Sequence, residues 1–205
     1  MEDGLQAMIN SKQELNFYIQ ADRMMNIGYF TPSLGQSIKN FLMPNYIMRY
    51  LKVLRKSEYF SVRGGVLKYW YKYKLDRMGY KTGFTIAPNV FGYGLVIPHH
   101  GTIVVGSGNH IGNYAVLHTG ICITAGEKKI GDSFYVSTGS RILGSVELGN
   151  NVTVGANAVV NKGGFSNCLL TGIPAVYKRD DKPWYFGEEW TRRVNACEEL
   201  RRKML

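Results

Sequence analysis

An aliphatic residue returns at every sixth position through the middle of this chain. This spacing fits neither the period of about 3.6 residues of a helix nor the period of about two residues of a strand. It is the signature of a parallel β-helix, in which short strands and tight turns stack coil upon coil. One residue is inserted into the series near residues 125–128. The members of the series are Val105, Ile111, Leu117, Ile123, Ile130, Val136, Ile142, Leu148, Val154 and Val160.

A second residue of these repeats, four positions after the first, is apolar or small. Glycine directly follows the aliphatic residue in half of the repeats, where a residue without a side chain lets the backbone turn at a corner. We therefore expect the aliphatic residues to form continuous ladders inside a solenoid. The second positions are Ala115, Ile121, Phe134, Ser140, Val146, Val152 and Ala158.

The N-terminal part of the chain carries no such repeat and is predicted to be helical. Pro44 should kink or split one of its helices, because proline lacks the amide that a helix interior needs. Ser33 is the candidate N-cap of that helix, and the Gly64-Gly65 pair marks a turn before the next one. The expected helices cover residues 6–25, 34–59 and 66–78.

The composition changes after residue 83 to β-branched residues, glycine and asparagine. We therefore divide the chain into an N-terminal helical region (1–80), a β-helix domain (81–178) and a C-terminal loop and helix (179–205). At 205 residues the chain is long enough to bury a substantial core. The C-terminal helix is expected to cap the open end of the solenoid, since the last coil otherwise exposes its strand edges.

The net charge of +10 is concentrated in residues 39–81, which hold eleven basic residues against Glu58 and Asp76. Such a region suits a membrane surface, a phosphorylated substrate or nucleic acid, or it is a solvated helical face. Aromatic and cationic residues alternate over residues 69–74, as in interfacial helices. No nucleic-acid-binding motif accompanies this run. We expect peripheral contact with an anionic membrane through residues 39–81, and no nucleic acid.

The chain gives no sign of export or membrane insertion. Its first four residues lack the positive charge and apolar run of a secretory signal, and no later run is long enough to span a bilayer. Three cysteines without metal-ligand spacing predict neither a disulfide framework nor a zinc site. A cytoplasmic protein is expected, with membrane association left open.

All four histidines fall within residues 99–118, namely His99, His100, His110 and His118. Histidine is the natural general base near neutral pH, because its ordinary pKa is about 6.5. Clustered histidines also bind metals, but no pair here has the spacing of a zinc site, so no metal is expected. The cluster therefore indicates acid–base chemistry.

Three motifs resemble those of hexapeptide-repeat acyltransferases of the serine acetyltransferase type, most closely the capsule and lipopolysaccharide O-acetyltransferases. They are GFTIAPNVFGYGL at residues 83–95, GLVIPHHGTIVVG at residues 94–106 and TGIPA at residues 171–175. The resemblance covers about residues 66–178. It implies a mainly β fold, a left-handed parallel β-helix with an N-terminal helical region and a C-terminal helix, assembled as a homotrimer.

The resemblance implies that His99 is the general base, which takes the proton from an acceptor hydroxyl as that oxygen attacks the acetyl-CoA thioester. His118 matches a second active-site histidine and lies about one coil further along. His100 is expected to be secondary, and His110 to be structural or at the surface. Each of these roles comes from the resemblance.

The resemblance also implies that acetyl-CoA binds in the groove between adjacent β-helices. Small residues there let pantetheine approach the backbone, while lysine and arginine meet the phosphates. Arg179, and with less support Lys128 and Lys129, are further candidates for the phosphates. The matching cofactor-binding residues are Gly139, Ser140, Ala156, Asn157, Gly172, Pro174 and Lys178.

Two departures from the serine acetyltransferase pattern bear on the acceptor. Pro98 stands where those enzymes have an aspartate before the base. Thr85, or Phe84 if no gap is allowed, stands where they have an orienting acid. We therefore expect an acetyl-CoA-dependent O-acetyltransferase that acts on a sugar hydroxyl in surface polysaccharide biosynthesis, that of capsule or lipopolysaccharide. The alternative is a serine O-acetyltransferase in cysteine biosynthesis, and a third possibility is a non-catalytic trimeric scaffold.

Overall fold

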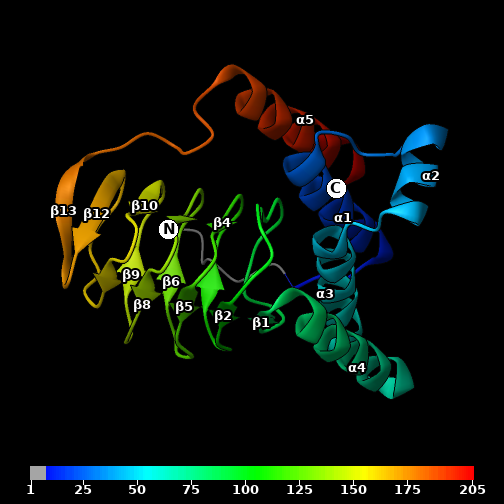
Figure 1. Ribbon diagram of the computed structural model, residues 1–205, viewed down its shortest axis with the longest axis horizontal. Coiled ribbons are helices and arrows are strands. Elements are labelled where there is room, and N and C mark those ends of the chain that lie inside the picture. The colour runs from blue at the N-terminus through cyan, green and yellow to red at the C-terminus, as the bar shows by residue number, and fades with distance from the viewer. Residues whose placement is uncertain (1–7) are drawn as a thin grey trace.

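The computed structural model describes residues 8–205 as a group of helices beside a three-sided β-solenoid (Figure 1). Residues 1–7 lie outside this description. They include the start of the chain considered above for a secretory signal and the first two residues of the helix expected over residues 6–25. The helices pack at the first coil of the solenoid, and the coils then continue away from them.

Capping residues and breaks set the bounds of the first helices. Helix α1 (Lys12–Ile27) begins with a capping box at Ser11 and ends at Gly28. Ser33 caps α2 (Leu34–Leu42) through a hydrogen bond from Gln36, as predicted. Pro44 separates α2 from α3 (Tyr46–Arg63), and Gly64 separates α3 from α4 (Gly65–Thr82). The region expected to form one interrupted helix is therefore two helices.

The strands of the described residues form three stacks, all parallel except for β13, which we call the first, second and third sheets. The first contains β1 (Phe84–Ile86), β2 (Ile103–Val105), β5 (Ile121–Ile123), β8 (Arg141–Ile142) and β11 (Val159–Val160). The second contains β3 (His110–Ile111), β6 (Lys129–Ile130) and β9 (Glu147–Leu148). The third contains β4 (Val116–Leu117), β7 (Tyr135–Val136), β10 (Val152–Val154), β12 (Cys168–Gly172) and β13 (Ala175–Asp180).

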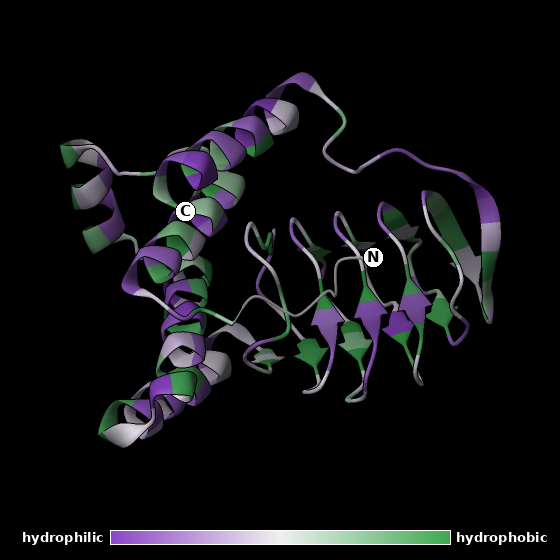
Figure 2. Cartoon of the chain, turned by 180° about the vertical axis from the view of Figure 1, so that it is seen from behind, coloured by the Kyte–Doolittle hydropathy of each residue, from purple (hydrophilic) through white to green (hydrophobic). Residues whose placement is uncertain are grey.

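The repeat positions form the core of the solenoid, as predicted. All ten members of the aliphatic series are buried, none more than 5% exposed. The second positions are buried as well, from Ala115 to Ala158. Outward residues of the same strands are polar or partly exposed, which gives the alternating hydropathy visible along the coils in Figure 2. The parallel β-helix expected from the hexad spacing is therefore confirmed.

One edge of the solenoid carries the turns that lead from the third sheet into the first. Backbone hydrogen bonds of 2.6 to 3.0 Å join these turns, from Gly120 N to Thr102 O, from Gly139 N to Thr119 O and from Asn157 N to Thr138 O. The final turn of the edge lies between β12 and β13. We call it the histidine edge, and it comprises residues 98–102, 118–120, 137–140, 155–158 and 173–174.

A buried ion cluster joins the helices to the first coil. Arg55 of α3 is fully buried, and its Nε lies 2.7 Å from the carboxylate of Asp22 on α1. Its Nη1 lies 3.0 Å from Glu58 and also donates to the carbonyl of Phe91. The Asp22 carboxylate raises the pKa of Arg55 although burial opposes this, so the guanidinium is charged. Charges removed from water need such complete pairing.

The C-terminal segment does not cap the far end of the solenoid, so this expectation is wrong. Strand β13 pairs antiparallel to β12 and covers the last edge instead. The chain then returns along the solenoid, and α5 (Glu188–Met204) packs against α1 at the opposite end (Figure 1). Apolar packing explains the return, because Val194 and Cys197 of α5 are buried in one cluster with Phe17 and Met25 of α1.

Candidate functional site

His118 begins the turn between β4 and β5 on the histidine edge. Its side chain is half-buried, and its Nε2 lies 2.7 Å from the hydroxyl of Tyr135. Strands β4 and β7 pair in parallel with Val116 beside Tyr135, which brings the tyrosine next to the turn of the preceding coil. The two rings lie 5.1 Å apart. This pair forms the polar centre of the site.

The turn that carries His99 and His100 is longer than the one that carries His118. Val96 pairs with Val116, and Ile103 pairs with Ile121. Residues 96 and 103 are seven positions apart, whereas their partners 116 and 121 are five positions apart. The turn at residues 98–102 is therefore two residues longer than the turn at residues 118–120. Both histidines of this longer turn are exposed.

Helices hold both ends of the longer turn. On α1, the Oδ1 atom of Asn26 accepts a hydrogen bond from Ile97 N at 3.1 Å, and its Nδ2 donates to Leu95 O at 2.8 Å. At the other end of the turn, Gly101 N donates to the carbonyl of Thr82, the last residue of α4, at 2.9 Å. The backbone that presents His99 is therefore fixed while its side chain faces solvent.

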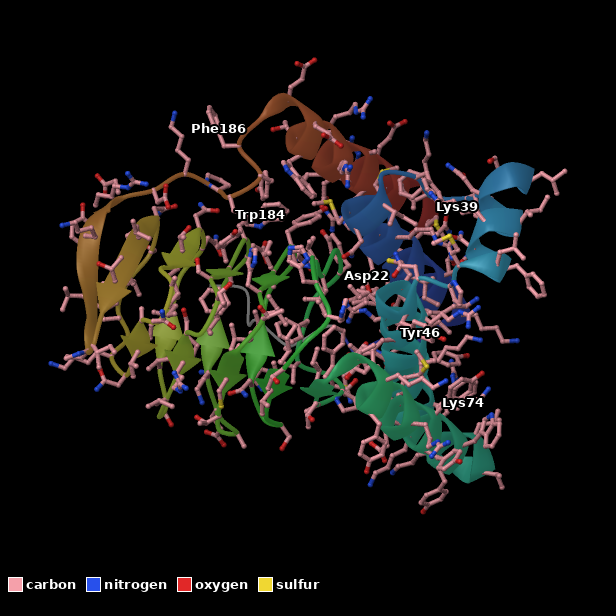
Figure 3. All side chains as sticks on the ribbon, viewed as in Figure 1. Asp22, Lys39, Tyr46, Lys74, Trp184 and Phe186 are labelled. Carbon is pink, nitrogen blue, oxygen red and sulfur yellow. The ribbon has the colours of Figure 1, made fainter. Side chains whose placement is uncertain are left out.

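A cleft of about 530 Å³ opens beside His118 and Tyr135 and reaches Pro98, the residue before His99. Helix α1, the start of α3 and the C-terminal segment supply its other walls, including Trp184 and Trp190. The indole of Trp184 donates to the carbonyl of Tyr114 at 2.7 Å, which fixes its ring (Figure 3 labels Trp184). Mostly apolar clefts with a few converging polar groups are typical small-molecule sites.

The electrostatics of the cleft favour neutral groups. Burial lowers the pKa of His118, and the charge of His99 lowers it further. Burial also raises the pKa of Tyr135, so its phenol stays protonated. A neutral imidazole near pH 7 has a lone pair that can accept a proton.

Five of the predicted cofactor residues lie along the histidine edge beyond His118. Gly139 has a φ of 76° and Asn157 a φ of 57°, and they occupy consecutive turns. A Cβ atom at residue 139 would lie 2.1 Å from the Oδ1 of Asn157, so any larger residue there would displace the Asn157 side chain. The exposed members of the group further along the edge are Ala156, Asn157, Gly172 and Pro174.

Three other candidates are not exposed on the histidine edge. The Ser140 side chain is buried, and its hydroxyl donates to Gly155 O at 2.8 Å, so it stabilises the coil. Lys178 is exposed on β13, beside Leu169 and Leu170 on the face of the third sheet. Lys128 is fully buried, and its Nζ donates to Thr124 O at 2.8 Å. The expectation that Lys128 meets phosphates is therefore wrong.

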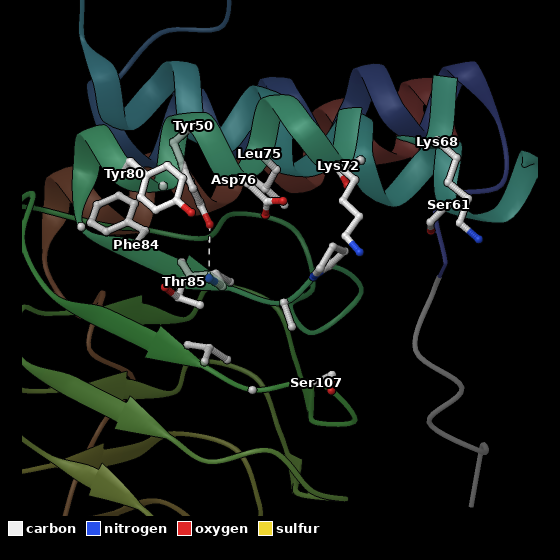
Figure 4. Close-up of a pocket in the computed structure, with 18 residues that line it drawn as sticks. Tyr50, Ser61, Lys68, Lys72, Leu75, Asp76, Tyr80, Phe84, Thr85 and Ser107 are labelled. Atoms are coloured by element: carbon white, nitrogen blue, oxygen red, sulfur yellow. Dashed lines mark hydrogen bonds between the residues drawn. The ribbon is translucent and has the colours of Figure 1, made fainter. Parts of the chain in front are cut away.

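Thr85 lines a different cleft from His118. This second cleft, of about 740 Å³, lies between α4 and β1, with Lys68, Lys72 and Asp76 on the helix side (Figure 4). Tyr50 closes its floor, where its hydroxyl accepts a hydrogen bond from Ile86 N at 3.3 Å. A carboxylate at residue 85 would therefore lie in the cleft under α4 and not beside the His118–Tyr135 pair.

The four histidines do not form a metal site. Within residues 8–205 no three His, Cys, Asp or Glu side chains gather closely enough to hold an ion. His110 lies on β3 in the second sheet, away from the histidine edge. The structure thus places His118 and His99 on consecutive turns of one edge and His110 on another side of the solenoid.

Sequence reasoning missed Tyr135, Trp184 and Asn26 as residues of the site. Tyr135 had a usable signal, because it lies 17 positions after His118, about one coil further along. The other two had none. Asn26 and Trp184 come from parts of the chain outside the repeat, and only the packed structure brings them to the cleft.

Comparisons with known proteins agree with this fold. Residues 127–162 match the family described as "Bacterial transferase hexapeptide (six repeats)". Serine acetyltransferase of Synechococcus elongatus is 31% identical over 45% of this chain and 41% of its own length. Serine acetyltransferase of Staphylococcus epidermidis is 35% identical over 45% of this chain and 47% of its own length. The chain thus spans about half the length of the curated relatives it matches.

Solved structures of serine acetyltransferases resemble this chain over a longer span. That of Neisseria gonorrhoeae has a TM-score of 0.64 at 22% identity, over 83% of this chain and 70% of its own. A serine acetyltransferase in complex with CoA has a TM-score of 0.60 at 20% identity, over 80% of this chain and 68% of its own. At this identity the likeness shows the fold.

These comparisons support a hexapeptide-repeat acyltransferase domain of the serine acetyltransferase type and correct two expectations. The relatives are named serine acetyltransferases, so a closest likeness to capsule and lipopolysaccharide O-acetyltransferases is not supported. For the same reason, the expected sugar acceptor in surface polysaccharide biosynthesis is wrong.

Proposed function

We propose that this protein is an acetyl-CoA-dependent serine O-acetyltransferase, the alternative considered from the sequence. The observation that carries the proposal is that His99 and His118 lie on consecutive, hydrogen-bonded turns of one solenoid edge. The curated relatives of this solenoid are named serine acetyltransferases, and one structural neighbour holds CoA. Position and relatives support the same chemistry.

In the proposed reaction His99 is the general base. It accepts the proton of the serine hydroxyl as that oxygen attacks the carbonyl carbon of the thioester. The carbon–sulfur bond then breaks, the acetyl group stays on the serine oxygen, and the CoA sulfur leaves and takes up the proton from His99. His118 remains neutral beside the base, because burial and the charge of His99 lower its pKa.

The proposal gives Tyr135 and His118 a positioning role. The resemblance to serine acetyltransferases puts an orienting acid where this chain has Thr85, and Thr85 lines the cleft under α4. Tyr135 belongs to the third sheet, whereas Thr85 belongs to the first sheet on the other side of the histidine edge. The Tyr135 hydroxyl lies 2.7 Å from the Nε2 of His118. We propose that this neutral pair orients the acceptor next to His99.

Acetyl-CoA is proposed to lie along the histidine edge from His118 toward residues 173–174. Gly139, Ala156, Asn157, Gly172 and Pro174 would contact it, and Lys178 would meet its phosphates from β13. A neighbouring β-helix would cover the edge in a homotrimer. We also propose that the protein is cytoplasmic. The proposed domain bounds remain 1–80 for the helical region, 81–178 for the β-helix and 179–205 for the C-terminal segment. Contact of residues 39–81 with an anionic membrane is argued below.

The test is the release of CoA from acetyl-CoA by the purified full chain with L-serine as acceptor. We expect serine-dependent release in the wild type and a loss of about 10²- to 10⁴-fold in His99→Ala, the range for removing a general base. His118→Ala should also lose activity. His110→Ala is the matched control, because this histidine lies in the second sheet, and it should retain wild-type turnover.

Calorimetry with CoA separates the ways in which the proposal could fail. Binding of CoA without serine-dependent turnover would overturn serine as the acceptor. Absence of CoA binding would favour the non-catalytic scaffold. Equal turnover in His99→Ala and wild type would remove His99 as the base and leave the acceptor assignment intact.

A further inference from the structure

Helix α2 presents its apolar side to solvent. Leu34, Ile38 and Phe41 lie on one side of the helix, and their side chains are 80%, 55% and 82% exposed. Gln36 and Asn40, on the other side, are half-buried, and no residue of α2 is buried. Surface helices normally turn their apolar side toward the core. This helix shows the reverse arrangement.

Helix α4 presents a stripe of aromatic side chains to solvent. Its buried residues, Leu75, Gly79 and Thr82, lie on one side of the helix. On the opposite side, pairs of exposed residues three, four or seven positions apart form one row along the helix. The row consists of Val66, Tyr69, Trp70, Tyr73 and Tyr80.

The two exposed sides belong to one end of the molecule. Figures 1 and 2 show α2 and α4 at the end of the long axis opposite β13. Tyr46, at the start of α3, lies between them and is 42% exposed. The cations of Arg49 and Lys81 lie 5.8 and 5.6 Å from its ring centroid. We call these exposed sides, with Tyr46, the α2–α4 surface (Figure 3 labels Lys39, Tyr46 and Lys74 here).

The charge on the α2–α4 surface is almost entirely positive. Arg49, Lys74, Arg77 and Lys81 accompany its apolar residues, and none of them forms an ion pair within residues 8–205. Glu58, one of the two acids in this part of the chain, is buried against Arg55. A second copy of this surface would bring cations against cations. An anionic partner would neutralise them.

We propose that the α2–α4 surface docks on an anionic phospholipid bilayer. Leucine, phenylalanine, tyrosine and tryptophan suit the boundary between headgroups and acyl chains, and the cations suit lipid phosphates. Charge and the aromatic run over residues 69–74 suggested this partner from the sequence, and the outward apolar side of α2 is the independent observation. Contact is peripheral, since the described helices include none with the length and apolar character of a transmembrane span.

The test is co-sedimentation of the full chain with vesicles of phosphatidylcholine, with or without phosphatidylglycerol. We expect binding only to the anionic vesicles, weakened by salt. Arg77→Gln combined with Lys81→Gln should weaken binding about 25-fold, at about fivefold per cation near the surface. Leu42, next to Phe41 at the end of α2, is 71% exposed as well. Phe41→Ser combined with Leu42→Ser should weaken binding without removing any charge.

The matched control is Lys162→Gln combined with Arg202→Gln, which removes the same charge from exposed positions outside the surface. It should bind like the wild type. Equal binding to neutral vesicles, or equal loss in this control, would overturn the proposal. So would binding to a short RNA without binding to vesicles, or a smaller assembly mass in the Phe41/Leu42 variant, which would mean that a second copy covers the surface. Vesicle binding is measured without acetyl transfer, so its failure would not contradict the proposed serine O-acetyltransferase activity.

Discussion

The Nε2 atom of His118 lies 2.7 Å from the hydroxyl of Tyr135 on the neighbouring coil. Burial keeps both groups neutral, because it lowers the pKa of the imidazole and raises that of the phenol. The hydrogen bond therefore fixes a ring orientation without placing a charge in the cleft. The same register that stacks the coils creates this pair, since Val116 and Tyr135 are partners in the ladder.

Tyr135→Phe should lower kcat about three- to tenfold, the effect of losing one neutral hydrogen bond. The KM for acetyl-CoA should stay the same, because the tyrosine lies in the cleft and not along the proposed cofactor path. A neutral imidazole with its proton on Nδ1 accepts a hydrogen bond from the phenol at Nε2. Loss of that donor should let the imidazole protonate more readily, so the acidic limb of the pH–rate profile should move to higher pH. Steady-state kinetics with L-serine across this pH range measure both effects.

Tyr71→Phe is the matched control for Tyr135→Phe. Its hydroxyl accepts a hydrogen bond from Lys56 at 3.4 Å on the helices, outside the cleft. It should leave kcat and the pH profile unchanged. A fall in kcat for Tyr135→Phe with an unmoved pH profile would indicate a purely structural role for the tyrosine.

Acid should destabilise the fold through His118. The folded state holds the pKa of this histidine below its ordinary value by burial and by the charge of His99. The unfolded chain takes up the proton near pH 6.5, so stability falls as the pH drops below about 6.5 and this effect is absent above it. In thermal unfolding, His118→Gln should lose less stability than the wild type between neutral and mildly acidic pH. An identical loss in both proteins would contradict the lowered pKa.

The hexad spacing predicted the solenoid core and brought the site histidines to one edge. Ile111, Leu117 and Val136 are buried because an inward position recurs once per side of every coil. The same arithmetic indicated that residues 99 and 118 would lie near each other. Local periodicity was sufficient here because each coil pairs only with its neighbours.

The walls of the cleft could not be predicted in this way. Asn26 and Trp184 reach the first coils from helices and loops far away in the sequence, and their contacts have no period. The return of α5 depends on packing of Val194 and Cys197 against α1, which short-range patterns do not encode. Lys128 looks like a surface lysine in the sequence, and only the coil geometry buries it.

Arg55→Met should destabilise the protein by about 3 to 5 kcal/mol, the usual cost of leaving a buried charge without its partner. The substitution leaves Asp22 and Glu58 buried without a cation and removes the donor to the Phe91 carbonyl. Urea unfolding measures the change.

Lys129→Met is the control, because its pair with Glu147 is 3.6 Å long with side chains 72% and 76% exposed. It should change stability by less than about 1 kcal/mol. Similar losses of stability in both variants would show that the Arg55 ion cluster does not stabilise the packing of the helices on the solenoid.

Gly139→Ala should destabilise the histidine edge more than Gly144→Ala. Both glycines have a positive φ, 76° at residue 139 and 67° at residue 144. Alanine adopts this left-handed conformation at a cost of about 1 kcal/mol, so both substitutions should lower the free energy of unfolding by that amount. Only residue 139 has a neighbour in the way, because its Cβ would lie 2.1 Å from the Oδ1 of Asn157, while residue 144 has no atom within 4 Å. The extra loss in urea unfolding therefore measures the contact between consecutive turns.

Gly139→Ala should also weaken CoA binding in calorimetry, since it displaces Asn157, which lies on the proposed cofactor path. Equal stability of the two variants would show that Asn157 moves freely, and unchanged CoA affinity would remove Asn157 from that path.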